Sequence, residues 1–360
     1  MPAWLANEPE RFSTLLVAWQ AQGGRHDLPW QNTRNPYRVW LSEIMLQQTQ
    51  VTTVLGYYER FLNKFPTVTD LAAAQSDDVL ALWSGLGYYS RARNLHRCAQ
   101  QVVSLHDSEF PKTAEMLQTL PGIGPSTAAA IASFCYAERV AILDGNVKRV
   151  LTRLLAFDGD LAQSKQEKQL LNLANRVLPL TELDQTMPRY TQGVMDLGAT
   201  LCTLRKPQCG ACPVQILCQG FAQQQPERFP IKTRKLKRSS QQLFVLLAQQ
   251  PDGSVWLERR ADSGIWGGLY SLPVFETEAQ LMTALPTELQ SDVKLLDEFK
   301  HVLTHKDLYL KPFKTAWHTG LAATLKIDSE ISGWYRPDEW PQLGLPTPMR
   351  KLLSGETQHG

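Results

Sequence analysis

The chain has 360 residues, of which 43% are hydrophobic and 20% are charged, and its formal net charge is +2. This length and this ordinary globular composition predict two domains with full-sized cores, and the balanced charge neither requires nor excludes nucleic acid. We expect a cytoplasmic protein without a signal peptide or membrane anchor, because acidic residues interrupt the N-terminal segment and no apolar run reaches membrane-spanning length.

Helical spacing of apolar residues dominates the chain up to about residue 220. The stretch 37–65 shows this spacing until Pro66 ends it. No convincing run of strands occurs in this part, so we predict a mainly α N-terminal domain. Further helices are expected over 79–83, 91–103, 114–120, 127–134 and 146–157.

Beyond residue 222 the composition changes. Residues 223–240 are polar and Gln-rich, and 228–238 carries basic residues and no acidic one, which is typical of a solvated interdomain linker. Beside a DNA-binding domain the same basic run would suggest nucleic acid. Two β-rich runs, 243–248 and 255–258, flank a Pro-Asp-Gly turn and predict a hairpin. With a later strand-like run at 308–317, they indicate a smaller α+β C-terminal domain.

The segment WLSEIMLQQTQV places Glu43 among apolar residues. A carboxyl group in apolar surroundings has a raised pKa and can act as a general acid near neutral pH. The alternative is that Glu43 is an exposed residue between two apolar faces. Gln47, Gln48 and Thr49 follow at the predicted helix end, with side chains long enough to wedge into a base stack.

The segment LPGIGPSTAAAI, residues 120–131, reads as a tight turn between two helices. Gly122 and Gly124 can adopt backbone angles that are closed to other residues. Such a turn presents bare N–H groups at a helix N-terminus, where a DNA phosphate binds well without sequence being read. The segment resembles the helix-hairpin-helix DNA-binding element; the alternative is a plain helix–helix turn.

One helix further on, Asp144 stands at the expected N-cap of an amphipathic helix in ILDGNVKRVLTRL. Most aspartates at such a position are simply caps. A carboxylate one helix past a phosphate-binding turn is also placed to face a bound nucleotide.

Four of the six cysteines are concentrated in one segment with the spacing Cys-x6-Cys-x2-Cys-x5-Cys, at Cys202, Cys209, Cys212 and Cys218. Disulfides are rare in cytoplasmic proteins, so metal binding is the favoured interpretation. Four thiolates suit zinc or an iron–sulfur cluster, and the spacing leaves both open. The other two, Cys98 and Cys135, fit apolar helix faces and are expected in the core.

Together these motifs resemble the endonuclease III superfamily of DNA glycosylases and, within it, the adenine DNA glycosylase (MutY) family. MLQQTQV and GLGYYSRARN are similar to motifs of that family, and a second domain fits it. Ser126 stands where the lyase-type members of the superfamily carry a lysine nucleophile. The resemblance is strong over 25–220 and weaker over 241–350.

The resemblance implies a catalytic helix-hairpin-helix domain over 1–222. Residues 31–144 would form a six-helix barrel, and 1–30 with 145–222 an iron–sulfur subdomain. A linker over 223–240 would lead to a Nudix-like lesion-recognition domain over 241–360. The family also implies that the four clustered cysteines bind a 4Fe–4S cluster that is not the catalyst.

The resemblance further implies roles for individual residues. Glu43 would protonate the leaving adenine and help to activate water, and Asp144 would stabilise the sugar cation. Asn146 would orient that site. The adenine must first leave the base stack, and Gln48 and Tyr88 resemble the family residues that wedge into the space it leaves.

In this family the C-terminal domain recognises 8-oxoguanine opposite the adenine. GIWGGLYSLP, residues 264–273, fits a Nudix-like fold, whereas the acidic Nudix catalytic box is missing, so this domain should read the lesion and not hydrolyse nucleotides. The family's Phe-Ser-His element aligns with Leu303, Thr304 and His305. Thr304 keeps a hydroxyl that can bond to the lesion base, while Leu303 lacks the aromatic ring.

We therefore predict a monofunctional, monomeric adenine DNA glycosylase with a 4Fe–4S cluster. It would act on double-stranded DNA with adenine opposite 8-oxoguanine or G and leave an abasic site. Three alternatives are weighed against it. A glycosylase/lyase conflicts with Ser126, and a nucleotide pyrophosphatase conflicts with the missing acidic box. A non-catalytic, redox-sensing DNA-binding protein requires Glu43 to be a bystander and Asp144 a mere cap.

Overall fold

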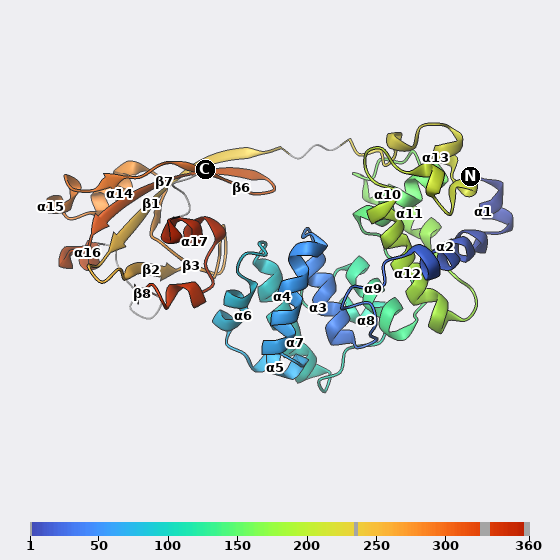
Figure 1. Cartoon of the computed structure of the whole chain (residues 1–360), viewed down its shortest axis with the longest axis horizontal. Helices are drawn as coiled ribbons and strands as arrows, with labels where there is room; N and C mark the ends of the chain where they lie inside the picture. The colour runs from blue at the N-terminus through green and yellow to red at the C-terminus, as the bar shows by residue number, and fades with distance from the viewer. Residues whose placement is uncertain (1, 234–236, 325–331, 356–360) are drawn as a thin grey trace. The chain divides into compact units, whose positions relative to one another are not determined.

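A computed structural model describes residues 2–233, 237–324 and 332–355 of the chain. It divides into two compact units. The first unit comprises Met1–Ala72 and Arg97–Lys235, and the second comprises Ala73–His96 and Leu236–Gly360. The first unit is helical and the second carries a β-sheet (Figure 1). The predicted domain boundaries stay a prediction, and the helical segment Ala73–His96 belongs to the same compact unit as the sheet.

The first unit is built from helices joined by short turns. The helix α7 (Ser90–Leu105) begins in the second unit and continues into the first. The other helices are α1 (Ala3–Asn7), α2 (Glu10–Gly23), α3 (Pro36–Leu46), α4 (Val51–Lys64), α5 (Val68–Ala73), α8 (Ala114–Leu117), α9 (Pro125–Tyr136), α10 (Gly145–Leu155), α11 (Ser164–Arg176), α12 (Leu183–Thr200) and α13 (Gln219–Ala222).

The apolar stretch over 37–65 forms two helices, α3 and α4, instead of one. Asn35 caps α3 by accepting the Arg38 N–H at 3.2 Å. The break between the two helices contains Gln48, whose φ is +59°. A residue in the left-handed region cannot continue a right-handed helix. The other predicted helices are present as α6 (Ser76–Trp83), α7, α8, α9 and α10, with ends shifted by a few residues.

The first unit's core is formed where α12 packs against α2 and α10. Gly198 of α12 permits a close approach to α10, since a Cβ added there would lie 2.8 Å from the Cβ of Asn146. Cys98 and Cys135 are buried as predicted, with 0% and 8% of their surfaces exposed.

Part of the predicted linker over residues 223–240 is hydrogen-bonded to the first unit. The Arg153 Nε donates to the Phe229 carbonyl at 3.2 Å, and the Leu161 N–H donates to the Ile231 carbonyl at 3.0 Å. The Thr233 N–H donates to Asp160 at 3.2 Å. The first half of the linker is therefore held on the first unit by hydrogen bonds.

The second unit contains a mixed sheet with the order β3-β2-β1-β7-β5. Strands β4, β6 and β8 pair with β1, β7 and β2 respectively. The strands are β1 (Ser239–Gln249), β2 (Val255–Arg259), β3 (Tyr270–Ser271), β4 (Val274–Phe275), β5 (Lys294–Leu295), β6 (Phe299–Val302), β7 (Lys306–Ala316) and β8 (Ser332–Tyr335), and the helices are α6, α14 (Glu278–Ala284), α15 (Thr287–Gln290), α16 (Thr319–Thr324) and α17 (Thr347–Ser354).

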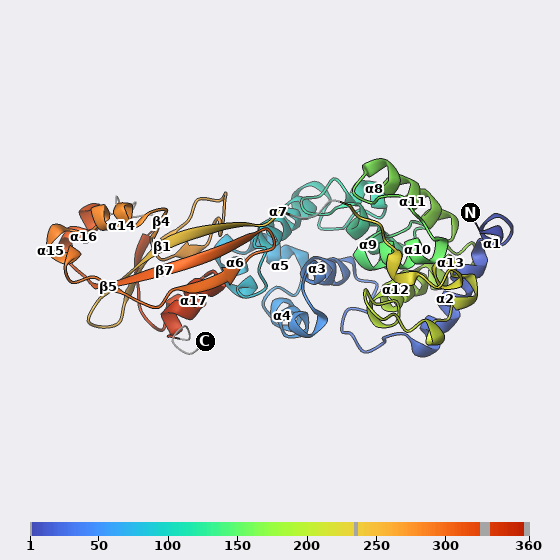
Figure 2. The ribbon, with the colours of Figure 1, turned by 90° about the horizontal axis from the view of Figure 1, so that it is seen from above.

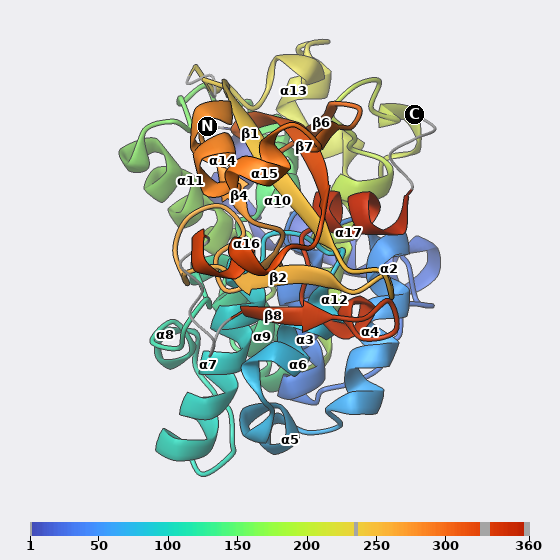
Figure 3. The ribbon, with the colours of Figure 1, turned by 90° about the vertical axis from the view of Figure 1, so that its left-hand side faces the viewer.

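The predicted hairpin and late strand are confirmed. Strands β1 and β2 pair antiparallel around a turn in which Gly253 has a φ of +88°. The run 308–317 falls largely within β7, which lies parallel to β1 along the full length of both strands (Figure 2). Strand β8 lies beside β2 (Figure 3). Because β1 is central, its residues 243–248 are buried.

No helix in the described ranges combines the length and the apolar character needed to span a lipid bilayer.

The close contact at Gly198 gives a prediction for stability. A Gly198→Ala substitution should lower the stability of the first unit by about 1–3 kcal/mol, because the added methyl meets the backbone of α10. Thermal or denaturant unfolding measures this. The control is Gly56→Ala on α4, where an added Cβ meets nothing within 4 Å and should stabilise the helix by up to about 1 kcal/mol. Equal effects of the two substitutions would contradict the packing argument.

Candidate functional site

Glu43 lies on α3 with its carboxyl enclosed by the first unit. The residue as a whole is half-buried. The pKa of the Glu43 carboxyl is raised to about 8, mainly by burial and also by the nearby charge of Asp144. The two predicted acids are therefore close enough to influence each other, and Glu43 retains its proton at neutral pH.

Asp144 is the N-cap of α10, as predicted. Its Oδ1 accepts the Val147 N–H at 2.7 Å. Asn146, in the first turn of the same helix, accepts a hydrogen bond from the Arg149 guanidinium at 2.9 Å. The same guanidinium donates to the Cys202 carbonyl at 2.7 Å. A chain of hydrogen bonds therefore joins the first turn of α10 to the start of the cysteine loop.

The predicted hairpin joins α8 to α9. Gly122 has a φ of +76°, so this position requires glycine. Gly124 does not adopt such an angle. It is the N-cap of α9 with φ −83° and ψ 173°, and a Cβ there would meet nothing within 4 Å. The expectation of special backbone angles is thus confirmed for Gly122 and wrong for Gly124, because an N-cap is ordinarily extended.

Ser126 follows in the first turn of α9. Its Oγ accepts the Leu143 N–H at 3.3 Å, so it holds the backbone immediately before Asp144. The neighbouring Thr127 accepts a hydrogen bond from the Gln47 amide at 3.3 Å. The hairpin helix therefore contacts both the segment that carries Asp144 and the turn after α3.

The two predicted wedge residues share an unusual conformation. Gln48 has a φ of +59° and Tyr88 a φ of +49°, and both side chains are exposed. Left-handed backbone at residues other than glycine persists only where the surroundings hold it, and it is frequent at functional sites. Gln48 belongs to the first unit and Tyr88 to the second.

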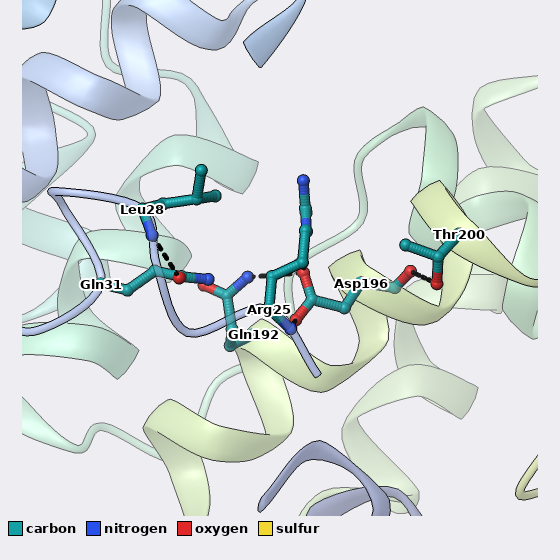
Figure 4. A network of polar contacts seen from close by, with 6 residues as sticks. All are labelled: Arg25, Leu28, Gln31, Gln192, Asp196 and Thr200. Carbon is teal, nitrogen blue, oxygen red and sulfur yellow. Dashed lines mark hydrogen bonds and ion pairs between the residues drawn. The ribbon is translucent and has the colours of Figure 1, made fainter. Parts of the chain in front are cut away.

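The first unit also has a polar cavity of about 410 Å³. Two residues that line it, Arg25 and Gln192, are held by Asp196 of α12, which has no exposed surface. The Arg25 backbone N–H and Nε donate to its carboxylate at 3.0 and 2.7 Å, and the Gln192 amide donates to it at 2.8 Å (Figure 4). The Gln31 Oε1 accepts the Leu28 N–H at 3.1 Å. Its buried Nε2 has no hydrogen-bond partner in the described part of the chain.

This cavity and Glu43 belong to the same unit. Phe134 lines it, and the charges of Arg34 and Glu43 both act on the thiol of the next residue, Cys135. Burial is the main cause that raises the pKa of Cys135 to about 12. One residue along α9 from a cavity-lining side chain, the Cys135 thiol is therefore within electrostatic range of Glu43.

The four clustered cysteines line one small cavity. The pKa of Cys212 is raised to about 12, mainly by burial and also by the charges of Cys202, Cys218 and Cys209, so the four thiols lie near one another. Such thiols fit an iron–sulfur cluster or zinc in donor chemistry. Across the described ranges, no group of three or more His, Cys, Asp or Glu is already arranged to hold a metal ion.

Arg153 holds the beginning of this loop. Its side chain is 1% exposed. The guanidinium donates to the Thr203 carbonyl at 2.7 Å, to the Leu204 carbonyl at 3.0 Å and to the Cys202 sulfur at 3.4 Å. A buried cation that donates to several backbone carbonyls orders the loop without needing a carboxylate.

The second unit has a cavity of about 610 Å³ whose walls come from two distant parts of the sequence. Tyr88 lines it together with Thr304 and His305, and the Tyr88 hydroxyl is hydrogen-bonded to the Thr304 hydroxyl. The loop 264–268 lines it as well, with Trp266 at a φ of +61°. Tyr88 and the pair Thr304 and His305, which were predicted from two different motifs, therefore lie around one cavity.

Residues 41–176 match the family model for HhH-GPD superfamily base excision DNA repair proteins, and residues 244–355 match the NUDIX domain. The chain is 34% identical to the adenine DNA glycosylase of Buchnera aphidicola subsp. Baizongia pistaciae, over 95% of this chain and 96% of the relative. It is 33% identical to the mouse adenine DNA glycosylase, over 97% of this chain and 78% of the relative. The chain belongs to the adenine DNA glycosylase family.

The fold of the first unit agrees with this membership. A thermostable thymine-DNA glycosylase aligns with 61% of this chain and 99% of its own, at 26% sequence identity and a TM-score of 0.52. Endonuclease III in a trapped complex with DNA aligns with 60% of this chain and 98% of its own, at 20% identity and a TM-score of 0.50. The predicted fold class, a helical glycosylase domain followed by a Nudix-like domain, is confirmed.

The polar cavity of the first unit and the residues that build it were not predicted from the sequence. Asp196 and Gln192 are spaced to share one face of α12, and this acid within an apolar helix was a signal that could have been used. Arg25 and Gln31 precede the first predicted helix and carry no periodic pattern. Only the fold brings them to α12.

The environment of Glu43 gives a prediction for stability against pH. The folded protein binds this proton with a pKa of about 8, against an ordinary value of 4.5. Over this interval the folded state binds more protons than the unfolded state, so the contribution of Glu43 to stability falls as pH rises. A Glu43→Gln variant cannot ionise. Its melting temperature relative to the wild type should therefore increase between about pH 5 and pH 8.5.

The control is Glu59→Gln on the exposed face of α4. It should not reproduce this pH dependence, because its side chain stays in water. If the difference in melting temperature between Glu43→Gln and the wild type is the same at both pH values, the fold does not hold the Glu43 carboxyl in its protonated form.

Proposed function

We propose that this chain is a monofunctional adenine DNA glycosylase that removes adenine opposite 8-oxoguanine or G and leaves an abasic site. One observation carries the proposal. Within the first unit the buried carboxyl of Glu43 keeps its proton and is within electrostatic range of a second carboxyl group, Asp144, and the same unit has a cavity lined by amide side chains. Family membership supports the same proposal, because the relatives are named adenine DNA glycosylases.

The polar cavity is suited to a purine base. Adenine presents an amino donor beside ring-nitrogen acceptors, and amide side chains match that pattern in two bonds. Gln31 offers a buried amide nitrogen that lacks an acceptor, and Gln192 offers a second amide. A base that enters the cavity must first leave the DNA base stack, at a cost of a few kcal/mol. A hydrogen bond from the Gln31 amide to the base, together with contacts to the DNA backbone, would offset this cost.

Glu43 and Asp144 would divide the reaction. Breaking the glycosidic bond leaves electrons on the base and positive character on the sugar. Glu43, still protonated at neutral pH, would donate its proton to the departing adenine and then help to activate water. Asp144 uses Oδ1 for the helix cap, which leaves Oδ2 to face the sugar cation. Asn146 would orient this end of α10 through Arg149.

Strand cleavage is not expected from this site. A lyase step needs an amine that forms a Schiff base with the sugar. Position 126 carries a hydroxyl, and that hydroxyl accepts the Leu143 N–H. The product would therefore be an intact strand with an abasic sugar.

Contacts with DNA would come from both units. The turn with Gly122 and Gly124 leads into α9, whose N-terminal N–H groups can bind a phosphate. Gln48 and Tyr88, exposed on left-handed backbone, would enter the space left by the flipped base. In the second unit, the cavity with Thr304 and His305 would receive the oxidised base opposite.

The cysteine loop would hold a 4Fe–4S cluster through Cys202, Cys209, Cys212 and Cys218. When bound, the cluster supplies four thiolate–iron bonds that fix the loop. The loop also carries Arg205 and Lys206, which would offer positive charge to phosphates. Monomeric state and cytoplasmic location stay predictions.

The proposal predicts the outcome of an excision assay on a duplex with one adenine opposite 8-oxoguanine. Breaks at the adenine should appear only after alkali. Glu43→Gln and Asp144→Asn should each slow excision by on the order of 10²–10⁴-fold under single-turnover conditions. Asn can still cap α10, so the Asp144 variant removes the charge while keeping the helix start.

Glu59→Gln serves as the control and should excise at the wild-type rate. Breaks without alkali would revive the lyase alternative. Full function in Asp144→Asn would favour the non-catalytic DNA-binding protein.

The cluster assignment predicts metal content. Purified protein should contain about four iron and four sulfide per chain. Cys212→Ala should lose most of this iron, whereas Cys98→Ala should keep it, because Cys98 is a buried core residue of α7. Elemental analysis measures both. Zinc in place of iron in anaerobically prepared protein would overturn the cluster in favour of the zinc alternative.

A further inference from the structure

Three residues of the turn between α6 and α7 lie in the left-handed region. Gly85 has a φ of +101°, Gly87 of +73° and Tyr88 of +49°. Glycine adopts such angles freely, whereas tyrosine does so only where its surroundings hold it. Tyr88 nevertheless remains 44% exposed. The contacts that hold its backbone must therefore come from neighbours beneath the turn and not from burial of its own ring.

Arg91 supplies these contacts. It lies in the first turn of α7 and is 8% exposed. One guanidinium nitrogen, Nη2, donates to the carbonyls of Leu86 and Gly87, both at 3.2 Å. Its backbone N–H donates to the Tyr88 carbonyl at 2.8 Å. A single residue thus contacts three successive peptide groups of the turn.

The same guanidinium lies against two aromatic rings. Its Cζ is 5.2 Å from the centroid of Trp83 and 5.5 Å from that of Tyr88. Both distances fall within the range of a cation–π contact. Trp83, which has no exposed surface, also donates its Nε1 proton to the Gly87 carbonyl at 3.1 Å. Arg91 therefore links the buried end of α6 to the exposed ring of Tyr88.

The position of this ring matters for the larger cavity of the second unit. Tyr88 lines that cavity and is hydrogen-bonded to Thr304. The neighbouring Tyr89 accepts the Gly85 N–H at 3.3 Å and donates to the Leu345 carbonyl at 3.0 Å. The turn is thus fixed both from beneath and from the side of the sheet.

We propose that Arg91 is a positioning residue for lesion recognition, which sets the Tyr88 ring at the wall of the cavity that receives the oxidised base. This rests on the proposed function, in which that cavity reads the base opposite the adenine. Arg91 acts through Tyr88 and touches no reacting atom. The role favours arginine, because the flat guanidinium lies against two aromatic rings while its Nη2 donates to two carbonyls, and the compact lysine ammonium lacks such an extended planar face.

The test compares excision of adenine opposite 8-oxoguanine with excision opposite G. Arg91→Met should lower kcat/KM for the first duplex by about tenfold more than for the second. Arg91→Lys should lose most of the same selectivity. Arg97→Met is the control, since it removes one exposed positive charge from the same helix and should leave the selectivity between the duplexes unchanged. Melting temperature and iron content establish that each variant is folded.

A double-mutant cycle with Tyr88→Ala separates the possible outcomes. If Arg91 acts through Tyr88, the double variant should be no less selective than Tyr88→Ala alone. If the losses of selectivity in the two single variants add fully in the double variant, the proposal is overturned. It is also overturned if Arg91→Met slows excision from both duplexes equally, or if Arg91→Lys is as selective as the wild type. Unchanged selectivity in Tyr88→Ala would instead remove the role of Tyr88 and, with it, the premise.

Discussion

The enclosure of one carboxyl group within the helical unit is the constraint on which the proposed chemistry depends. Glu43 keeps its proton at neutral pH because protein replaces water around it, and the charge of Asp144 adds to the effect. Asp144 itself is placed by the start of α10, whose N–H groups favour a negative charge. One acid is thus placed in a buried environment and the other at a helix end, and in the proposed mechanism the first would donate the proton while the second would stabilise the sugar cation.

Backbone carbonyls and amides connect this pair of acids to the rest of the unit. Ser126 fixes the residue before Asp144, and Arg149 joins Asn146 to the Cys202 carbonyl. Arg153 then binds several carbonyls of the cysteine loop and the Phe229 carbonyl of the following segment. The cysteine loop therefore supports the geometry of α10 through hydrogen bonds, even though it is remote from the chemistry in the proposed mechanism.

The second unit also joins distant parts of the sequence. Its sheet is built around the long parallel pair of β1 and β7, while the segment 73–96 adds α6 and the glycine-rich turn before α7. The resulting cavity has walls from both parts of the sequence. Left-handed backbone at Tyr88 and Trp266 aims side chains that an ordinary turn would direct elsewhere.

The sequence alone determined the features that are local in the chain. Apolar periodicity predicted most helices, the Pro-Asp-Gly turn predicted the β1–β2 hairpin, and Asp144 was correctly placed at a helix N-cap. The cysteine spacing indicated a metal site but could not distinguish zinc from iron–sulfur, since both use four thiolates. Gly124 was misjudged, because a motif does not reveal which of two glycines takes the left-handed angle.

Only the tertiary structure decided what depends on residues distant in sequence. The raised pKa of Glu43 requires protein on all sides of its carboxyl, and the cavity at Asp196 requires Arg25 and Gln31 to reach α12. The left-handed backbone angle of Gln48 was also hidden, because nothing in the residue types at this helix end indicates it. Periodicity reports which face of an element is buried, whereas desolvation, the pairing of a buried charge and a contact such as Tyr88 with Thr304 arise when separate elements pack together.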